Sequence, residues 1–212
     1  MIISRKQCRS TDGFTMIEIL VVLGIIIILA GITFGLVSGV SERGRMARAE
    51  TELRLIAQSL EQFRTQYGDY PWVGTATTSN NEEALFNALA GITGPQGDPI
   101  IDDSNSARVG RVFIDFSRIT VGDGNNEVLD EGAFNQLPMA GDPSPGVLQR
   151  RFLDPWGNPY RYYYRNGNSP DNWRRSGFIL YSMGPEGSHS PPGNNGVITE
   201  SSANMDNIYH DN

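Results

Sequence analysis

The stretch GFTMIEILVVLGIIIILAGI, residues 13–32, decides the fold of this chain. From Ile19 to Ile32 no residue is polar, and the apolar character continues as far as Val40. A helix needs about 20 such residues to cross a bilayer, so the run is long enough. Basic residues precede the run, and such residues ahead of a span place the N-terminus in the cytoplasm. We therefore predict one membrane-spanning helix over residues 14–40.

Two other kinds of N-terminal segment combine a basic start with an apolar run. A cleavable secretory signal has a shorter apolar core, and cleavage near Ser38-Gly39 would remove the run. An ordinary membrane anchor would keep its N-terminal residues. The single cysteine, Cys8, precedes the run and rules out a disulfide within one chain. Lipidation of Cys8 would need an apolar stretch ahead of it, where the sequence is basic instead.

Residues 13–18 carry a more specific pattern, in which Phe14 follows Gly13 and Glu18 is the fifth residue counted from Phe14. This pattern, leading directly into the apolar run, resembles the processing site of type IV pilins and type II secretion pseudopilins. The resemblance implies that residues 1–13 are a leader and that prepilin peptidase cuts after Gly13. It also implies that Phe14 becomes the N-methylated N-terminus of a subunit that assembles through this helix.

Glu18 has two candidate partners. A carboxylate in an apolar span costs about 2.5–3.5 kcal/mol on insertion scales, so it normally has a partner. Thr15 and Glu18 fit the T-x-x-E capping box, which satisfies free amides at a helix start. The family resemblance implies instead that Glu18 pairs with the Phe14 amine of a neighbouring subunit during assembly. The residues alone leave both interpretations open.

Gly31, Gly35 and Gly39 recur every four residues and share one face of the predicted helix. Small residues at this spacing let helices approach closely inside a membrane. Glycine is also simply commoner in membrane helices than in soluble ones. Many members of the resembled family carry a proline where Gly35 stands.

An amphipathic pattern follows the apolar run. Apolar residues at alternating spacings of three and four form one helical stripe, made of Met46, Ala49, Leu53, Ile56, Leu60, Phe63 and Tyr67. A glycine and a proline then end the pattern within residues 68–71. We predict a continuous helix from Phe14 to Tyr67, whose second half packs on a globular domain and does not form a seam between subunits.

The rest of the chain predicts a small, loop-rich globular domain. Residues 80–89 have the caps and acidic first turn of a short helix. Residues 111–116 are apolar and β-branched enough to predict a strand, and residues 162–164 and 178–182 predict a hairpin. Residues 91–150 are rich in turn-forming pairs, and we predict that they are an insertion relative to the resembled family. The fold class is thus α+β: a pilin-like fold with a long N-terminal helix on a small antiparallel sheet, the globular part covering residues 41–212.

The motif Asp-Pro-Trp-Gly-Asn-Pro-Tyr at residues 154–160, followed by residues 182–187, resembles the major pseudopilin of type II secretion. The resemblance implies calcium binding in the C-terminal loop. Carried over residue by residue, the ligands are Glu186, the backbone carbonyls of Met183 and Ser188, and the late pair Asp206 and Asn207. Calcium prefers several oxygen ligands in a flexible loop.

Two further groups of polar residues give weaker signals for metal. Residues 123–131 lack the glycine and glutamate spacing of an EF-hand, so we predict a turn there. His189 and His210 have neither a cysteine partner nor a tight spacing, which makes zinc binding a poor interpretation.

The formal net charge of −7 argues against nucleic acid as a partner. No phosphate-binding glycine loop, nucleophile elbow or H-E-x-x-H motif occurs, so we do not expect an enzyme. The resemblance implies a structural pseudopilus subunit for type II secretion, single-pass in the bacterial inner membrane with its globular domain in the periplasm. Partners would be other copies, minor pilin-like subunits, the inner-membrane assembly platform and prepilin peptidase. The alternatives are a type IV pilus subunit for adhesion, motility or DNA uptake, and a membrane-anchored binding module.

Overall fold

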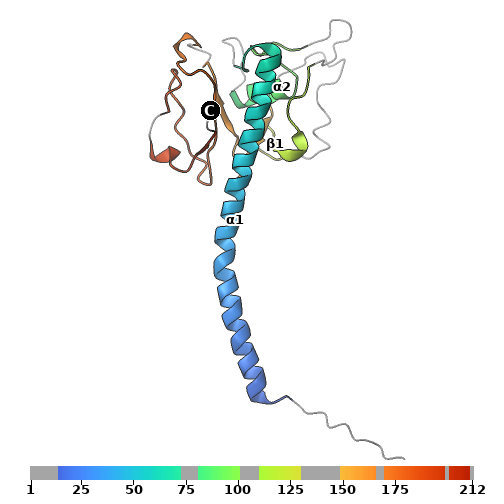
Figure 1. The fold of residues 1–212 in the computed structure, drawn as a ribbon, viewed down its shortest axis with the longest axis vertical. Helices are drawn as coiled ribbons and strands as arrows, with labels where there is room; N and C mark the ends of the chain where they lie inside the picture. Colours follow the sequence, from blue (N-terminus) through green and yellow to red (C-terminus); the bar gives the residue numbers. More distant parts are fainter. Residues whose placement is uncertain are drawn as a thin grey trace, which may run out of the picture. The chain divides into compact units, whose positions relative to one another are not determined.

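The computed structural model describes residues 14–72, 81–100, 110–129, 149–165, 170–198 and 201–210 (Figure 1). The side chains of residues 32–39 and 170 lie outside that description. The chain divides into two compact units, Met1–Arg43 and Gly44–Asn212. The predicted leader, residues 1–13 with Gly13 at its end, lies outside the described residues.

Helix α1 spans Met16–Tyr67 and confirms the predicted long N-terminal helix. It starts directly after Thr15, where the capping box predicts a start. It ends where Gly68 adopts a φ of +88° and donates its N–H to the carbonyl of Arg64 at 2.7 Å. Glycine adopts this left-handed conformation at no steric cost, which is why it ends helices so often.

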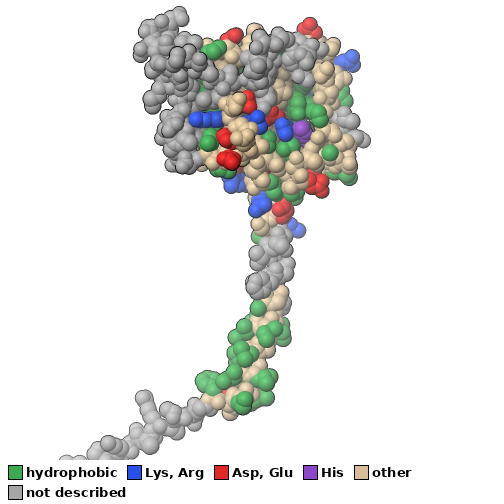
Figure 2. Space-filling view, turned by 180° about the vertical axis from the view of Figure 1, so that it is seen from behind, with side chains coloured by type: hydrophobic (Ala, Val, Ile, Leu, Met, Phe, Trp, Pro, Cys, Tyr) green, Lys and Arg blue, Asp and Glu red, His purple; other side chains and the backbone are tan. Residues whose placement is uncertain are grey.

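The described apolar side chains from Ile17 to Leu29 in the N-terminal unit are exposed, and Figure 2 shows apolar side chains on one face of this part of α1. Judged on the residues that the structure describes, no helix is both long enough and apolar enough to cross a membrane. The span over residues 14–40 stays a prediction.

The globular unit contains two short antiparallel sheets. Strand β1 (Thr120–Gly122) pairs with β2 (Arg151–Leu153). Strand β4 (Ile179–Ser182) lies between β3 (Arg161–Tyr163) and β5 (Ile208–Tyr209). Within the described ranges, 3-10 helices occupy Phe116–Arg118, Pro170–Asn172 and Ser202–Asn204.

The predicted hairpin is confirmed by the pairing of β3 with β4, in which Tyr162 lies opposite Leu180. Because side chains alternate along a strand, the two faces of this sheet bury different residues. Tyr162 and Leu180 face the main core, while Tyr181 and Met183 belong to a second, smaller cluster on which Ile198 packs.

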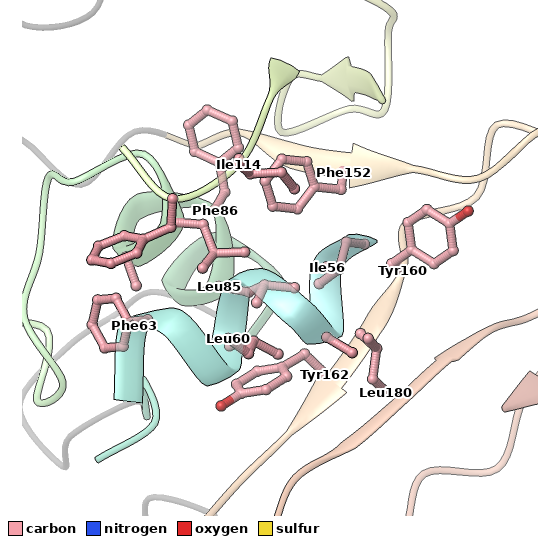
Figure 3. Close-up of a cluster of buried hydrophobic side chains, with 14 of the residues drawn as sticks. Ile56, Leu60, Phe63, Leu85, Phe86, Ile114, Phe152, Tyr160, Tyr162 and Leu180 are labelled. Carbon is pink, nitrogen blue, oxygen red and sulfur yellow. The ribbon is translucent and has the colours of Figure 1, made fainter. Parts of the chain in front are cut away.

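The main core lies against one stripe of α1 (Figure 3). Leu53, Ile56, Leu60 and Phe63 are each at most 1% exposed, as the amphipathic spacing predicts. At the N-terminal end of the predicted stripe, Met46 is exposed. The side chains that meet this face of α1 come from α2, from the residue 113–121 segment and from both sheets: Leu85, Phe86, Phe113, Ile114, Val121, Phe152, Tyr162 and Leu180.

Helix α2 spans Asn81–Leu89, as predicted to within one residue. Its two first-turn acids are buried and form ion pairs with arginines of the sheets. Glu82 contacts Arg161 at 2.7 Å, and Glu83 contacts Arg151 at 2.9 Å. These charge-assisted hydrogen bonds fasten α2 to β2 and β3.

The strand predicted over residues 111–116 is wrong. Phe113 and Ile114 are both buried although they are neighbours, which breaks the alternation of a strand. The N–H of Phe113 donates to the carbonyl of Leu89 at the end of α2, and Asp115 accepts from the N–H of Ser117 to start a 3-10 turn. Such local side-chain bonds compete with a sheet ladder. The strand forms later, at β1.

A buried polar network joins α1 to the rest of the unit. The carboxylate of Glu52 accepts from Tyr160 Oη and from Arg48 Nε, both at 2.7 Å. Arg48 also donates to Thr120 Oγ1 at 3.1 Å. Burial and the nearby carboxylate raise the pKa of Tyr160, which keeps the proton on the hydroxyl that donates to Glu52.

We predict that Tyr160→Phe destabilises the globular unit by about 1–3 kcal/mol, because it leaves a buried carboxylate oxygen of Glu52 without its donor. Urea unfolding followed by near-UV circular dichroism measures the change. Tyr67→Phe is the matched control, since the Tyr67 hydroxyl makes no hydrogen bond within the described residues. Equal stability of the two variants would contradict this role for the Glu52 network.

Candidate functional site

The first candidate site is the start of α1. Thr15 donates to Glu18 Oε2 from its N–H at 2.9 Å and from its hydroxyl at 2.7 Å. In the opposite direction, the N–H of Glu18 donates to Thr15 Oγ1 at 3.3 Å. This is the predicted capping box. Within one chain, therefore, Thr15 holds the Glu18 carboxylate, while pairing with the Phe14 amine of a neighbour stays a prediction.

In the single chain, the side chains at this end of α1 are exposed to solvent. Phe14 is 84% exposed and Met16 is 91% exposed. The described apolar residues from Ile17 to Leu29 are each at least half exposed. An exposed apolar surface of this extent marks a protein or membrane contact.

Only one of the three predicted packing glycines can be assessed. A Cβ added at Gly31 would meet nothing within 4 Å, so its face is open in the single chain. The positions of Gly35 and Gly39 fall among the undescribed side chains. Close packing of helices at these glycines stays a prediction.

The second candidate site is the loop after β4, where the structure brings the late acidic residues back to the residue 183–188 segment. Glu186 donates its N–H to Asp206 Oδ2 at 3.2 Å. Asp206 Oδ1 and Asn207 Oδ1 are buried and have no hydrogen-bond partner in the part of the chain that the structure describes. Buried oxygens without partners are costly, so this pair is suited to a bound cation.

The donor set fits a hard cation held by oxygen atoms. Among the described residues, no group of three or more histidine, cysteine, aspartate or glutamate side chains gathers to hold a metal. A cation here would therefore depend on backbone carbonyls and the Asn207 amide as well as on Glu186 and Asp206. Calcium accepts such mixed oxygen ligands in irregular loops. Met183 is buried at the end of β4, whereas Ser188 is exposed.

The remaining sequence candidates make contacts of other kinds. His189 packs on Tyr181, and burial lowers its pKa, whereas the ring of His210 stacks on Phe178 in the main core. Asp123 accepts from the N–H groups of Asn125 and Glu127, which confirms the predicted turn.

Sequence reasoning missed the role of Asp154. This residue is buried, and Oδ1 accepts from the N–H groups of Trp156 and Asn158 at 3.0 and 2.8 Å. Its Oδ2 accepts from the Ser182 hydroxyl at 2.6 Å. Burial raises the pKa of Asp154, although these hydrogen bonds oppose the rise. The Asp-Pro-Trp-Gly-Asn motif predicts the turn, but nothing in it predicts the contact with β4.

We predict that Gly184→Ala destabilises the globular unit more than Gly157→Ala does. Both glycines have positive φ, +66° and +88°, so both substitutions strain the backbone. A Cβ at Gly184 would also lie 2.5 Å from the backbone oxygen of Asp206, whereas one at Gly157 meets nothing within 4 Å. Thermal unfolding midpoints compare the two, and equal midpoints would contradict the close packing of the 184 and 206 segments.

Two comparisons with known proteins find similarity, one at the N-terminus and one over nearly the whole chain. A family model described as the prokaryotic N-terminal methylation motif matches residues 8–34. The chain is 26% identical over 192 residues to the type II secretion system core protein G of Pseudomonas aeruginosa. That alignment covers 91% of this chain and 96% of the relative. No solved structure matches the chain significantly.

The similarity is not confined to the segment that carries the methylation motif. It runs on through the second half of α1 and through the globular unit, where the structure has the α+β pilin-like arrangement that the sequence predicts. The chain therefore combines the prokaryotic N-terminal methylation motif with similarity, over nearly its whole length, to a type II secretion system core protein G.

Proposed function

We propose that this chain is a structural subunit of the pseudopilus that drives protein export in type II secretion, and that it assembles through its N-terminal helix. The observation that carries the proposal is the uncovered apolar surface of α1 from Met16 to Leu29, which lies within the residues that the methylation motif matches. Burying such a surface against like helices is strongly favourable. In this proposal the role is structural, and the chain catalyses no reaction.

Assembly would follow cleavage after Gly13 by prepilin peptidase. Cleavage frees the Phe14 amine, whose positive charge must enter the same apolar bundle as the Glu18 carboxylate of a neighbour. The free-energy cost of burying two opposite charges in an apolar bundle is much lower when they are paired than when they are apart. The capping box gives Glu18 a partner until that pairing is made.

The proposed location follows from the same helix. The N-terminus would lie in the cytoplasm, α1 would cross the bacterial inner membrane before extraction, and the globular unit would lie in the periplasm. The partners would be other copies of the chain, minor pilin-like subunits and the inner-membrane assembly platform. Residues 91–150, the predicted insertion, would be a surface feature of the filament.

We also propose that the globular unit binds calcium in the loop after β4. The support is the pair of buried oxygens without partners, Asp206 Oδ1 and Asn207 Oδ1, beside the Glu186 segment. Glu186, Asp206, Asn207 and the carbonyls of Met183 and Ser188 would hold the ion. A bound divalent cation would tie the C-terminal segment to the end of β4, in a chain that has no disulfide.

We predict that Glu18→Gln abolishes both subunit pairing and secretion. No lysine follows Lys6, so after cleavage the Phe14 amine is the chain's only amine. A carbodiimide joins amines to carboxylates in direct contact, and guanidinium groups do not react. Treated wild-type filaments should therefore give covalent dimers linked between Phe14 and Glu18, identified by mass spectrometry, and Glu18→Gln should give none.

Glu50→Gln is the matched control, an exposed glutamate farther along the same helix that should leave the dimers unchanged. The same variants, expressed in a strain that lacks the gene, are scored for exported proteins and surface filaments. Enzymes trapped in the periplasm with surface pili intact support the pseudopilus. Loss of pili with secretion intact would show a type IV pilus subunit instead.

We predict that calcium raises the melting temperature of the full chain in detergent, and that EDTA reverses the rise. Binding contributes about 2.7 kcal/mol when free calcium is about 100 times the Kd. Asp206→Asn should remove most of the rise, because it removes a charged ligand. Asp171→Asn makes the same chemical change on an exposed residue and should keep the rise. An equal rise in both variants would refute this site.

A further inference from the structure

The segment from Gly184 to Gly187 has a flexible glycine at each end, and Pro185 restricts only its own φ. Both glycines have positive φ, +66° and +64°, a region that glycine enters freely and other residues rarely enter. Glu186 lies between them and is exposed. Contacts with other parts of the chain therefore help to fix the conformation of the two glycines.

Asn158 contacts both glycines through its side-chain amide. Its Nδ2 donates to the carbonyl of Gly184 at 3.1 Å. At Gly187, an added Cβ would lie 2.9 Å from Asn158 Oδ1 and 3.2 Å from Nδ2. The amide thus packs directly on the Gly187 backbone, in space that only glycine leaves free.

Asp206 contacts the same segment. Its Oδ2 accepts from the N–H of Glu186, and its backbone oxygen lies where a Cβ of Gly184 would be. The segment is therefore held by Asn158 and by Asp206. Loss of Asn158 would remove the contact at Gly187 and the hydrogen bond to the Gly184 carbonyl, the two contacts that flank Glu186.

Asn158 is itself fixed in place by the buried Asp154. The N–H of Asn158 donates to Asp154 Oδ1, and the N–H of Asp154 donates to the carbonyl of Asn158, both at 2.8 Å. Asp154 is anchored in turn to Ser182 on β4, and the Ser182 hydroxyl accepts from the N–H of Gly184 at 3.1 Å. The turn at residues 154–158 is a rigid support for the loop.

We propose that Asn158 is a positioning residue for calcium binding, because its amide fixes the 184–187 segment. The fixed segment would bring Glu186 and the carbonyls of Met183 and Ser188 close to Asp206 and Asn207. The proposal rests on the calcium site proposed above. Asn158 would act through the backbone of Gly184 and Gly187 and is not one of the proposed ligands. Outer partners that orient metal ligands typically contribute about 10–100-fold to affinity.

Isothermal titration of the full chain in detergent with calcium chloride tests the inference. Asn158→Ala, which removes both contacts, should weaken the Kd for calcium by about 10–100-fold. Asn158→Leu keeps the volume near Gly187 but removes the donor to Gly184, and it gives the same test if the alanine variant fails to fold. Asn125→Ala changes an exposed asparagine in another turn and should leave the Kd unchanged.

The melting temperature in EDTA separates positioning from general stability. A merely structural role for Asn158 would lower that temperature and leave the Kd of the folded variant unchanged, and a Kd within twofold of wild type overturns the inference alone. Absence of calcium binding by the wild-type chain would overturn the calcium site and this inference together.

Discussion

The globular unit is organised by the burial of one face of α1. Leu53, Ile56, Leu60 and Phe63 leave water only because α2 and both sheets supply side chains to cover them. Packing of an amphipathic stripe, more than helix propensity, stabilises most helices in proteins. The buried carboxylate of Glu52 lies beside this face and makes the packing specific, since its oxygens are satisfied only when Arg48 and Tyr160 are both in place.

The local signals at the ends of elements predicted the helices well. The end of α1 at Tyr67 follows from Gly68, and its start follows from the Thr15–Glu18 box, because caps are set by residues close in sequence. The hairpin of β3 and β4 follows from two apolar runs around a turn. The strand over residues 111–116 was wrong because Phe113 bonds to the end of α2, a distant contact that composition does not encode.

The candidate sites show the same contrast between local signals and contacts that are distant in sequence. The cap at Glu18 could be predicted, since both partners lie within four residues, whereas the filament contact involves a second chain. The buried ion pairs of Glu82 and Glu83 were not predicted: as first-turn acids they suggested only a helix start, and their arginines lie far along the chain. The hydrogen bond from Asn158 to Gly184 in the loop after β4 joins residues 26 apart, beyond the reach of any local motif.

The shortness of the strands has a consequence for a protein that is crowded beside its own copies. The described strands are two to four residues long, and β5, at an edge of its sheet, has only two. Long exposed edges recruit other edges and lead to amyloid-like stacking, whereas very short ones offer too few backbone groups. Edges as short as these give neighbouring globular units little backbone with which to pair sheet to sheet.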